Sequence, residues 1–454
     1  MPPKFGTSGL RGLVSDLTDI VIRRYTGAFL AACPTGTGLY VARDLRPSSL
    51  SIAQTVIRSA RAAGLDVADC GEAATPALAL AAGEAVAAAI MVTGSHIPAD
   101  RNGLKFYTPE GEITKADEAA ILAAGPLPQA SREGGLTQRD IMIPYGARYS
   151  RAFGPEALRG LRIGIYQHST VQRDLLSDLF AALGAQTVRL GRSETFIPLD
   201  TEAVEPEVAA MLARWIVEHD LDAIVSADGD GDRPLLATPE GIVAGDILGP
   251  LTAHALGAKI VVTPVSSNTM AARSGRFEQV IQTRIGSPHV IAGMTDHPGR
   301  TVGYEANGGF LLGFEAEGHA GSLSPLLTRD AVLPLIAPLW QARRANRSLS
   351  DLCGDWPDRH TASGRLPQVS DRGLAHIAEQ IEKAPHRIHP TLADIAEIDR
   401  TDGFRASLPD GRILHLRPSG NAPEFRCYVE ADRAEEAERL RDETLDALAR
   451  LAED

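Results

Sequence analysis

Three segments of the chain repeat one pattern of apolar and polar residues. Each has a short apolar run, a polar turn, a helical stretch, a glycine and a second apolar run, and the three cover residues 38–71, 161–191 and 258–286. Within the first helical stretch, Ile52 and Val56 follow the spacing that places side chains on one helix face. Strands that alternate with helices of about 10–15 residues are typical of βαβ units with mainly parallel strands. The pattern predicts three related α/β domains, and one large sheet with several crossovers is the alternative.

The last part of the chain has a different pattern. Residues 399–431 alternate apolar and polar positions around a Pro-Asp-Gly turn at 409–411, which is typical of an antiparallel hairpin. A charged helical stretch follows, with Leu440, Leu445 and Leu448 on one side. The C-terminal segment is therefore expected to form a smaller α+β domain.

Changes of pattern and Gly- or Pro-containing stretches predict where the domains meet. Candidate linkers are residues 131–140, 245–250 and 355–368. The fold class we expect is α/β, with three related domains of mixed, mainly parallel sheets and a smaller C-terminal α+β domain. The predicted domains are 1–140, 141–247, 248–357 and 358–454.

Composition excludes some classes of protein. The 454 residues include 45 Lys and Arg against 58 Asp and Glu, a formal net charge of −13, and no basic run occurs. A nucleic-acid partner is therefore not expected. No uninterrupted apolar stretch reaches the roughly 18 residues of a membrane span, and the N-terminus has no signal-like apolar region. Four cysteines without a CxxC pair argue against a zinc ribbon or a disulfide scaffold. Together these features predict a soluble cytoplasmic protein.

The first candidate loop contains a serine. Ser95 follows the strand-like run 85–92, in a segment broken by glycine and proline. The C-terminal ends of strands are where doubly wound sheets bind ligands. Ser95 could be a nucleophile, a turn residue or a helix N-cap, and nearby His96 and Lys105 would supply a proton carrier and a fixed cation. A hydrolase-type triad is not favoured, because the Gly-x-Ser-x-Gly elbow is missing.

The second candidate loop contains three aspartates. Asp228, Asp230 and Asp232 alternate with glycines after a strand-like run, so their carboxylates can converge on one point and offer hard oxygen ligands to Mg²⁺ or Ca²⁺. An EF-hand does not fit, because its sixth and twelfth positions would be Arg233 and Pro239. A solvent-exposed acidic hairpin is the other alternative, although close carboxylates without a cation repel one another. Arg233 could hold either an aspartate or a phosphate.

Two further loops carry groups suited to a phosphosugar. Glu305 and Asn307 lie among glycines and could bind sugar hydroxyls, although Asn-Gly-Gly is also a good turn. Near the C-terminus, residues 417–421 and the following strand combine guanidinium groups, a hydroxyl and backbone N–H groups, which can hold a phosphate without a P-loop. A plain hairpin turn is the alternative there.

In this order and spacing, the motifs resemble those of the α-D-phosphohexomutase family. The matching segments are FGTSGLRG (5–12), TGSHIPADRNGLK (93–105), DGDGDR (228–233) and RPSGNAPEFR (417–426). The resemblance covers essentially the whole chain. It implies four domains around a central cleft, each of which contributes one loop.

The resemblance also implies a role for each matching residue. Ser95 would carry the phosphoryl group, and a phosphoryl oxygen would complete a Mg²⁺ site. The other implied roles are Mg²⁺ ligands for Asp228, Asp230 and Asp232; contact with the transferring phosphoryl group for Arg11, His96 and Lys105; sugar binding for Glu305 and Asn307; phosphate binding for Arg417, Ser419, Gly420 and Asn421; and further substrate contacts for Arg233 and Arg426.

The implied reaction is reversible phosphoryl transfer between hexose 6-phosphate and hexose 1-phosphate. It would proceed through phosphoserine and a hexose 1,6-bisphosphate, which would also act as activator, and phosphomannomutase activity is expected. Phosphoglucomutase, phosphoglucosamine mutase and a non-catalytic sugar-phosphate binder are the alternatives.

The sequence departs from the family motifs at two loops that bear on the substrate. Asn307 replaces the usual Ser of the sugar loop and no His follows it, and Asn421 stands where Thr is common. The protein is expected to be a monomer or homodimer.

Overall fold

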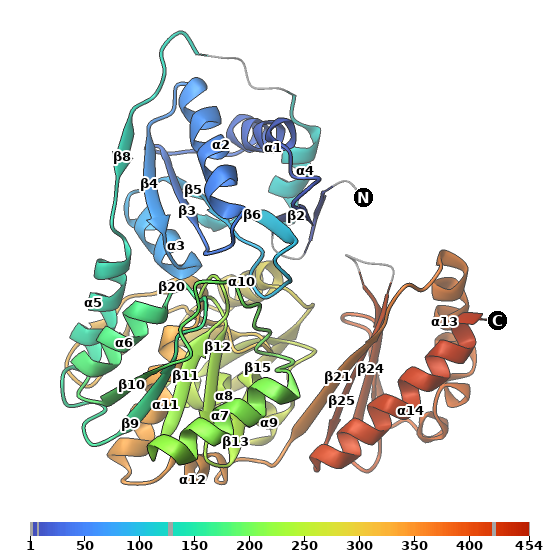
Figure 1. The fold of residues 1–454 in the computed structure, drawn as a ribbon. Coiled ribbons are helices and arrows are strands. Elements are labelled where there is room, and N and C mark those ends of the chain that lie inside the picture. Colours follow the sequence, from blue (N-terminus) through green and yellow to red (C-terminus); the bar gives the residue numbers. More distant parts are fainter. Residues whose placement is uncertain (1–2, 7–8, 126–129, 420–423, 454) are drawn as a thin grey trace.

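The computed structural model describes residues 3–6, 9–125, 130–419 and 424–453. Figure 1 shows three α/β units packed together and a C-terminal unit beside them, joined by the chain that leads into strand β21. The described strands form several separate sheets, which excludes the alternative of one large sheet. The fold class predicted from the pattern is confirmed.

The first unit has an eight-stranded mixed sheet in the order β1-β2-β6-β5-β3-β4-β8, with β7 paired to β6. Strands β5, β3, β4 and β8 run parallel, whereas β6 and β2 continue the sheet antiparallel. The elements are β1 (Lys4–Phe5), β2 (Leu10–Leu13), α1 (Asp19–Ala32), β3 (Leu39–Arg43), α2 (Ser49–Ala62), β4 (Val67–Glu72), α3 (Thr75–Glu84), β5 (Ala88–Val92), β6 (Arg101–Thr108), β7 (Gly111–Glu112), α4 (Lys115–Ala123) and β8 (Leu136–Gln138).

The second and third units share one design, as the repeated sequence pattern predicts. In each, three parallel strands (β10-β9-β11 and β15-β14-β16) continue into two antiparallel strands (β12-β13 and β17-β20). The second unit contains α5 (Met142–Phe153), β9 (Arg162–Tyr166), α6 (Arg173–Ala182), β10 (Gln186–Leu190), α7 (Pro206–His219), β11 (Ala223–Ala227), β12 (Pro234–Thr238) and β13 (Gly241–Val243). The third contains α8 (Gly245–Ala255), β14 (Ile260–Pro264), α9 (Met270–Arg273), β15 (Gln279–Thr283), α10 (Ser287–Asp296), β16 (Thr301–Tyr304), β17 (Phe310–Leu312), β18 (Ala316–Glu317), β19 (Ser322–Leu323), β20 (Leu326–Asp330), α11 (Val332–Arg344) and α12 (Leu349–Cys353).

The C-terminal unit is an antiparallel sheet, in the order β21-β25-β24-β23-β22, covered by helices. The predicted hairpin joins β23 to β24, and its turn is closed by the Gly411 N–H, which donates to the carbonyl of Leu408 at 2.9 Å. The elements are β21 (His360–Leu366), α13 (Asp371–Lys383), the 3₁₀ helices η1 (Pro385–Arg387) and η2 (Pro390–Ala393), β22 (Glu397–Asp399), β23 (Phe404–Ser407), β24 (Ile413–Pro418), β25 (Phe425–Ala431) and α14 (Ala434–Glu453).

The core explains why the first three units pack closely. One continuous cluster of buried side chains runs from the first unit, at Tyr107, through Ile163 of the second to Leu335 of the third. The C-terminal unit has its own core, which includes Phe425 and Leu448. We conclude that the first three units form one packed body, and that the C-terminal unit is attached to it less extensively.

Four local predictions were wrong. Residues 136–138 of the predicted linker 131–140 form strand β8, which pairs with β4. Residues 245–250 are not a linker but the start of α8, a helix whose burial outweighs the turn signals of Gly245 and Pro250. Residues 360–366 of the predicted linker 355–368 form strand β21. In the third repeat the helical stretch contains only the short helix α9, because Gly275, with φ +65°, follows in a left-handed conformation that ends it. The domain boundaries stay a prediction.

Candidate active site

Ser95 lies on the loop between β5 and β6, and its conformation is unusual. Its φ is +55°, a left-handed conformation that costs a non-glycine residue about 1–3 kcal/mol. The Ser95 N–H donates to Thr93 Oγ1 at 2.7 Å, and Ser95 Oγ donates to Asp228 Oδ2 at 2.5 Å. The side chain is 1% exposed. Ser95 is therefore held against the aspartate loop of the second unit.

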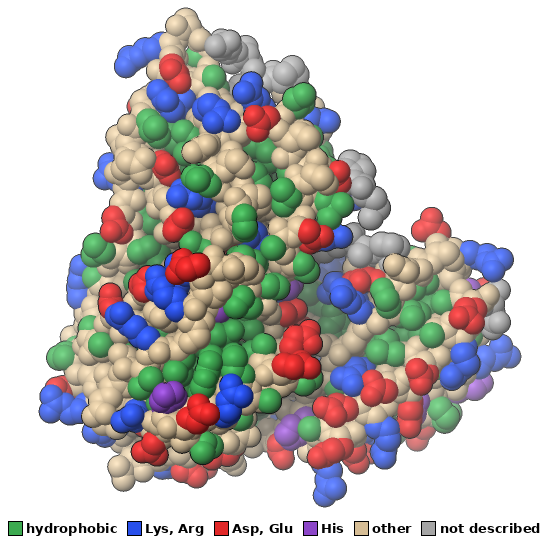
Figure 2. Space-filling model, in the orientation of Figure 1, with side chains coloured by type: hydrophobic (Ala, Val, Ile, Leu, Met, Phe, Trp, Pro, Cys, Tyr) green, Lys and Arg blue, Asp and Glu red, His purple; other side chains and the backbone are tan. Residues whose placement is uncertain are grey.

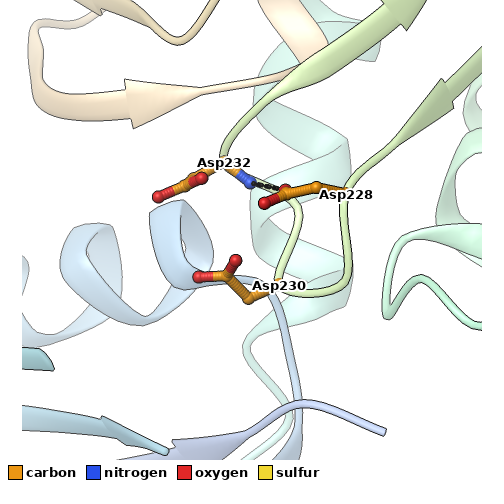
Figure 3. A group of neighbouring side chains, drawn as sticks. All are labelled: Asp228, Asp230 and Asp232. Carbon is orange, nitrogen blue, oxygen red and sulfur yellow. Dashed lines mark hydrogen bonds between the residues drawn. The ribbon is translucent and has the colours of Figure 1, made fainter. Parts of the chain in front are cut away.

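The three aspartates converge between β11 and β12, as Figure 3 shows. All three are fully buried, and one ligand atom from each lies within 4.8 Å of the others. Gly231, with φ +71°, lets the chain turn sharply between them. The N–H groups of Asp232 and Arg233 donate to Asp228 Oδ1 at 3.1 and 3.2 Å. The loop is thus a built carboxylate cluster, and the alternative of a solvent-exposed hairpin tip is excluded.

The charge around this cluster fits a divalent cation. Burial and the neighbouring carboxylates of Asp230 and Asp232 raise the pKa of Asp228 well above its usual value. Burial acts in the same direction on Asp232, but Arg329, Lys105 and Arg233 outweigh it and lower its pKa. Within the described part of the chain, the buried Oδ1 atoms of Asp230 and Asp232 have no hydrogen-bond partner. Hard oxygen donors of this kind suit Mg²⁺.

The sheet of the first unit brings cationic groups to the same place. Lys105 lies on β6, and its Nζ donates to Asp230 Oδ2 and Asp232 Oδ2, both at 2.6 Å. Burial alone would lower the pKa of Lys105, but the two carboxylates raise it. Arg11 lies on the neighbouring strand β2. Burial and repulsion from other arginines lower its pKa to about 10, so the guanidinium stays protonated at neutral pH.

His96 and Arg233 border the same site. The Nδ1 atom of His96 lies 3.4 Å from Ser95 Oγ, and burial, followed by nearby cations, lowers the pKa of His96 well below its usual value. The ring is therefore neutral at pH 7. The carboxylate of Asp200 lies 3.9 Å from His96 Nε2 and 3.8 Å from an Arg233 Nη atom.

Sequence reasoning missed Arg329, which joins the aspartate loop to the loop of Glu305 and Asn307. Its guanidinium donates to Asp232 Oδ2 at 2.7 Å, to Glu305 Oε2 at 2.7 Å and to Ser287 Oγ at 2.9 Å. Asn307 Nδ2 lies 3.4 Å from the same Glu305 oxygen. Glu305 and Asn307 are thus brought together beside the aspartates. Arg329 lies at the end of strand β20, where no motif marked it.

The segment between β10 and α7 was also missed. It has no helix or strand, yet the ring of Phe196 lies 4.1 Å from the guanidinium carbon of Arg46, beneath the Ser95 loop. Further along, Asp200 approaches His96, and Thr201 Oγ1 donates to the carbonyl of Asn307 at 3.1 Å. The segment therefore lines the site, although its sequence carried no signal beyond that of a loop.

The segment predicted to bind a phosphate, residues 417–426, lies on the separate fourth unit. Arg417 Nη1 donates to Asp402 Oδ2 at 2.8 Å, and Arg426 donates to Glu424 Oε1 at 2.9 and 3.0 Å. The Ser419 N–H donates to the carbonyl of Glu424 at 2.9 Å. Gly420 and Asn421 lie outside the described residues. Figure 2 shows the molecule hollowed between this unit and the rest, and a cavity of about 660 Å³ there has walls from both sides, including Ala306 and Tyr428.

Comparisons with known proteins agree with this geometry. Models described as phosphoglucomutase/phosphomannomutase alpha/beta/alpha domain I, alpha/beta/alpha domain III and C-terminal domain match residues 2–125, 244–359 and 370–447. The phosphomannomutase of Sinorhizobium fredii (strain NBRC 101917 / NGR234) is 43% identical, covering 97% of both chains. That of Salmonella muenchen is 43% identical and covers 95% of this chain and 93% of its own length.

More distant relatives also match most of the chain. A phosphoglucosamine mutase of Rhodococcus jostii (strain RHA1) is 27% identical, covering 98% of this chain and 99% of its own. The crystal structure of a phosphoglucomutase/phosphomannomutase family protein from Burkholderia thailandensis has a TM-score of 0.75 at 22% identity, with 98% of this chain and 97% of that chain covered. The chain described here belongs to the phosphoglucomutase/phosphomannomutase family.

Proposed function

We propose that this protein is a phosphohexomutase that interconverts hexose 6-phosphate and hexose 1-phosphate, with mannose phosphates as its preferred substrates. The observation that carries the proposal is the 2.5 Å contact between Ser95 Oγ and Asp228 within a fully buried cluster of three aspartates. A binder needs neither a buried nucleophile nor such a cluster. The 43% identity to two phosphomannomutases supports mannose as the sugar.

In the proposed reaction, a free sugar hydroxyl attacks the phosphorus of phospho-Ser95 and the P–Oγ bond breaks. The proton of the hydroxyl passes to a general base, and Oγ is reprotonated, which leaves a hexose 1,6-bisphosphate. After the bisphosphate has turned end for end, Oγ attacks the phosphorus of its other phosphate and the bond from that phosphorus to the sugar oxygen breaks. The Oγ proton passes to the general base and the sugar oxygen is protonated, which releases the isomeric monophosphate and restores phospho-Ser95. A bisphosphate supplied from solution would phosphorylate Ser95 and so activate the enzyme.

Catalysis in this site is mainly positioning and charge neutralisation. Asp228, Asp230 and Asp232 would hold Mg²⁺, which neutralises charge on the transferring group when it is bound. Arg11 and Lys105 add positive charge from the first unit. His96 is our candidate general base because its ring is neutral and lies 3.4 Å from Ser95 Oγ. Lys105, which is paired with two carboxylates, is the other candidate.

The remaining residues would bind the ends of the substrate. Glu305 and Asn307 are proposed to bind sugar hydroxyls, and Arg233, which lies beside the aspartate loop, is proposed as a further substrate contact. The non-reacting phosphate would be held by groups of the C-terminal unit, namely Arg417, Ser419, Gly420, Asn421 and Arg426. Because either phosphate of the bisphosphate must reach Ser95, this loop has to accept both orientations of the sugar. Its place on a separately packed unit supports that requirement.

Exchange of Ser95 for Ala tests the covalent mechanism. Ser95→Ala should abolish turnover while the protein still folds and binds sugar phosphate, and it should lose the added phosphate that mass spectrometry is expected to find on the Ser95 peptide of the wild type. Turnover at the wild-type rate would refute the mechanism. Rates with mannose, glucose and glucosamine 1-phosphates would identify the sugar. Glucosamine phosphate is the second candidate because the phosphoglucosamine mutase of Rhodococcus jostii matches 98% of this chain at 27% identity.

The wider context is also part of the proposal. We propose domain boundaries at 140/141, 247/248 and 357/358, a monomer or homodimer, a cytoplasmic location and no nucleic-acid partner. The net charge of −13 supports the absence of a nucleic-acid partner. Within the described residues, no helix is long and apolar enough to cross a membrane.

A further inference from the structure

Arg46 lies directly beneath the loop that carries Ser95. It is 2% exposed, and both terminal nitrogens of its guanidinium donate hydrogen bonds to that loop. One terminal nitrogen donates to the carbonyl oxygens of Ser95 at 2.8 Å and Ile97 at 2.5 Å, and the other donates to those of Pro98 at 2.7 Å and Arg101 at 3.2 Å. A planar guanidinium can satisfy four carbonyls in this way, whereas a lysine ammonium cannot.

Asp44 holds Arg46 in place and also accepts hydrogen bonds from the Ser95 loop. Its Oδ2 accepts from Arg46 Nε at 3.1 Å, from Thr93 Oγ1 at 2.7 Å and from the Gly94 N–H at 3.3 Å. Its Oδ1 accepts from the Arg46 N–H at 3.1 Å and from Ser49 Oγ at 2.5 Å. Both side chains of the pair are fully buried, so the carboxylate balances the charge that Arg46 brings under the loop.

Arg46 also connects the loop to the second unit. Phe196 of that unit stacks on the guanidinium at 4.1 Å, on the segment that precedes α7. On the loop side the packing is equally close, because a Cβ added to Gly94 would lie 2.6 Å from Arg46 Cζ. The guanidinium is therefore fixed between the Ser95 loop of the first unit and the unit that carries the three aspartates.

We infer that Arg46 is a positioning residue for phosphoryl transfer, held by Asp44 and Phe196, which fixes the left-handed conformation of Ser95 and the distance from its Oγ to the aspartate cluster. This inference rests on the proposed function. A displacement of a reacting group by about 1 Å costs roughly a hundredfold in rate. Loss of the four hydrogen bonds from the Arg46 guanidinium should therefore lower kcat. KM should change little, because these bonds go to the backbone of the Ser95 loop.

Two variants test the inference in the full-length protein with Mg²⁺ and mannose 1-phosphate. Arg46→Lys keeps the charge beside Asp44 but loses the two terminal nitrogens that bond the loop. Phe196→Leu removes only the stacking ring. The matched control is Arg58→Lys on α2, whose side chain is 52% exposed. For each variant we would measure kcat, KM, circular dichroism and the fraction of Ser95 that glucose 1,6-bisphosphate phosphorylates.

We expect Arg46→Lys to lower kcat about a hundredfold, Phe196→Leu to lower it less, and both to leave KM within about twofold of the wild type. Arg58→Lys should match the wild type. A folded Arg46→Lys with wild-type kcat, or a rise in KM at constant kcat, would overturn the inference. If Arg46→Lys does not fold, the test rests on Phe196→Leu: a lower kcat at nearly constant KM supports the inference, and a wild-type kcat overturns it. An inactive wild type would instead refute the proposed function.

Discussion

Replacing Arg329 by Met should destabilise the site from its centre. Arg329 is 6% exposed and forms ion pairs with Asp232 and Glu305, each at 2.7 Å. Both carboxylates are themselves buried. Met fills a similar volume but carries no charge, so Arg329→Met would remove the cation that Glu305 and Asp232 share, although Asp232 would keep Lys105 at 2.6 Å.

The size of the effect follows from the burial of the three groups. Removing one partner of a buried ion pair costs about 3–5 kcal/mol, because the remaining charge keeps its desolvation penalty. The three packed units together have about 350 residues, for which the unfolding entropy per residue implies about 1.4 °C per kcal/mol, so the midpoint of thermal unfolding should fall by about 4–7 °C. Scanning calorimetry would measure this shift. Adding Glu305→Gln to Arg329→Met should recover part of it, since one stranded charge is then removed.

A surface arginine provides the control. The side chain of Arg189 is 60% exposed and pairs with Asp178 at 3.2 Å, so Arg189→Met should cost no more than about 1 kcal/mol. If Arg329→Met shifted the midpoint no more than Arg189→Met, Arg329 would not stabilise the buried carboxylates, and the electrostatic account of the site given above would be wrong.

Three further predictions follow from the same structure. Chelation with EDTA should stop turnover and added Mg²⁺ should restore it; activity that survives chelation would contradict the role of the aspartate cluster. Arg417→Ala should raise KM for both hexose 1-phosphate and hexose 6-phosphate by similar factors, whereas a loss confined to one isomer would rule out a shared distal clamp. Burial, with Glu430 and Glu202 nearby, raises the pKa of Asp246 to about 7. The pKa of an aspartate in the unfolded chain is about 3.9. Between about pH 4 and pH 7 the folded protein therefore keeps a proton on Asp246 that the unfolded chain has lost, and the free energy of unfolding falls as the pH rises through this range. Asp246→Asn should remove this fall in urea unfolding at pH 5 and pH 8, and an unchanged difference between the two would refute the assignment.

The parts of the fold that depend on local pattern could be predicted from the sequence. The repeated apolar runs predicted the three α/β units, and the Pro-Asp-Gly turn predicted the β23–β24 hairpin. The errors arose where packing overrides local preference. Gly245 and Pro250 resemble turn residues, but they lie in a helix buried between neighbouring elements.

The candidate site shows the same division. Ser95 and the aspartates could be found because each lies in a short motif with its own spacing, and the structure brings them together at 2.5 Å. Arg329 and Asp200 could not be found, because each is an ordinary polar residue that matters only through partners far away in sequence. Arg329, for example, is 97 residues from Asp232. No rule based on spacing within one loop can identify such a partner.

The charge balance of the aspartate loop depends on side chains from all three α/β units. The loop belongs to the second unit, but Lys105 reaches it from the first unit and Arg329 from the third, each at 2.6–2.7 Å. Thr75, also of the first unit, donates through its hydroxyl to Asp230. Three fully buried carboxylates would be strongly destabilising without these partners. Formation of the site therefore depends on the packing of the three units, and the continuous core that joins them holds the site residues in place.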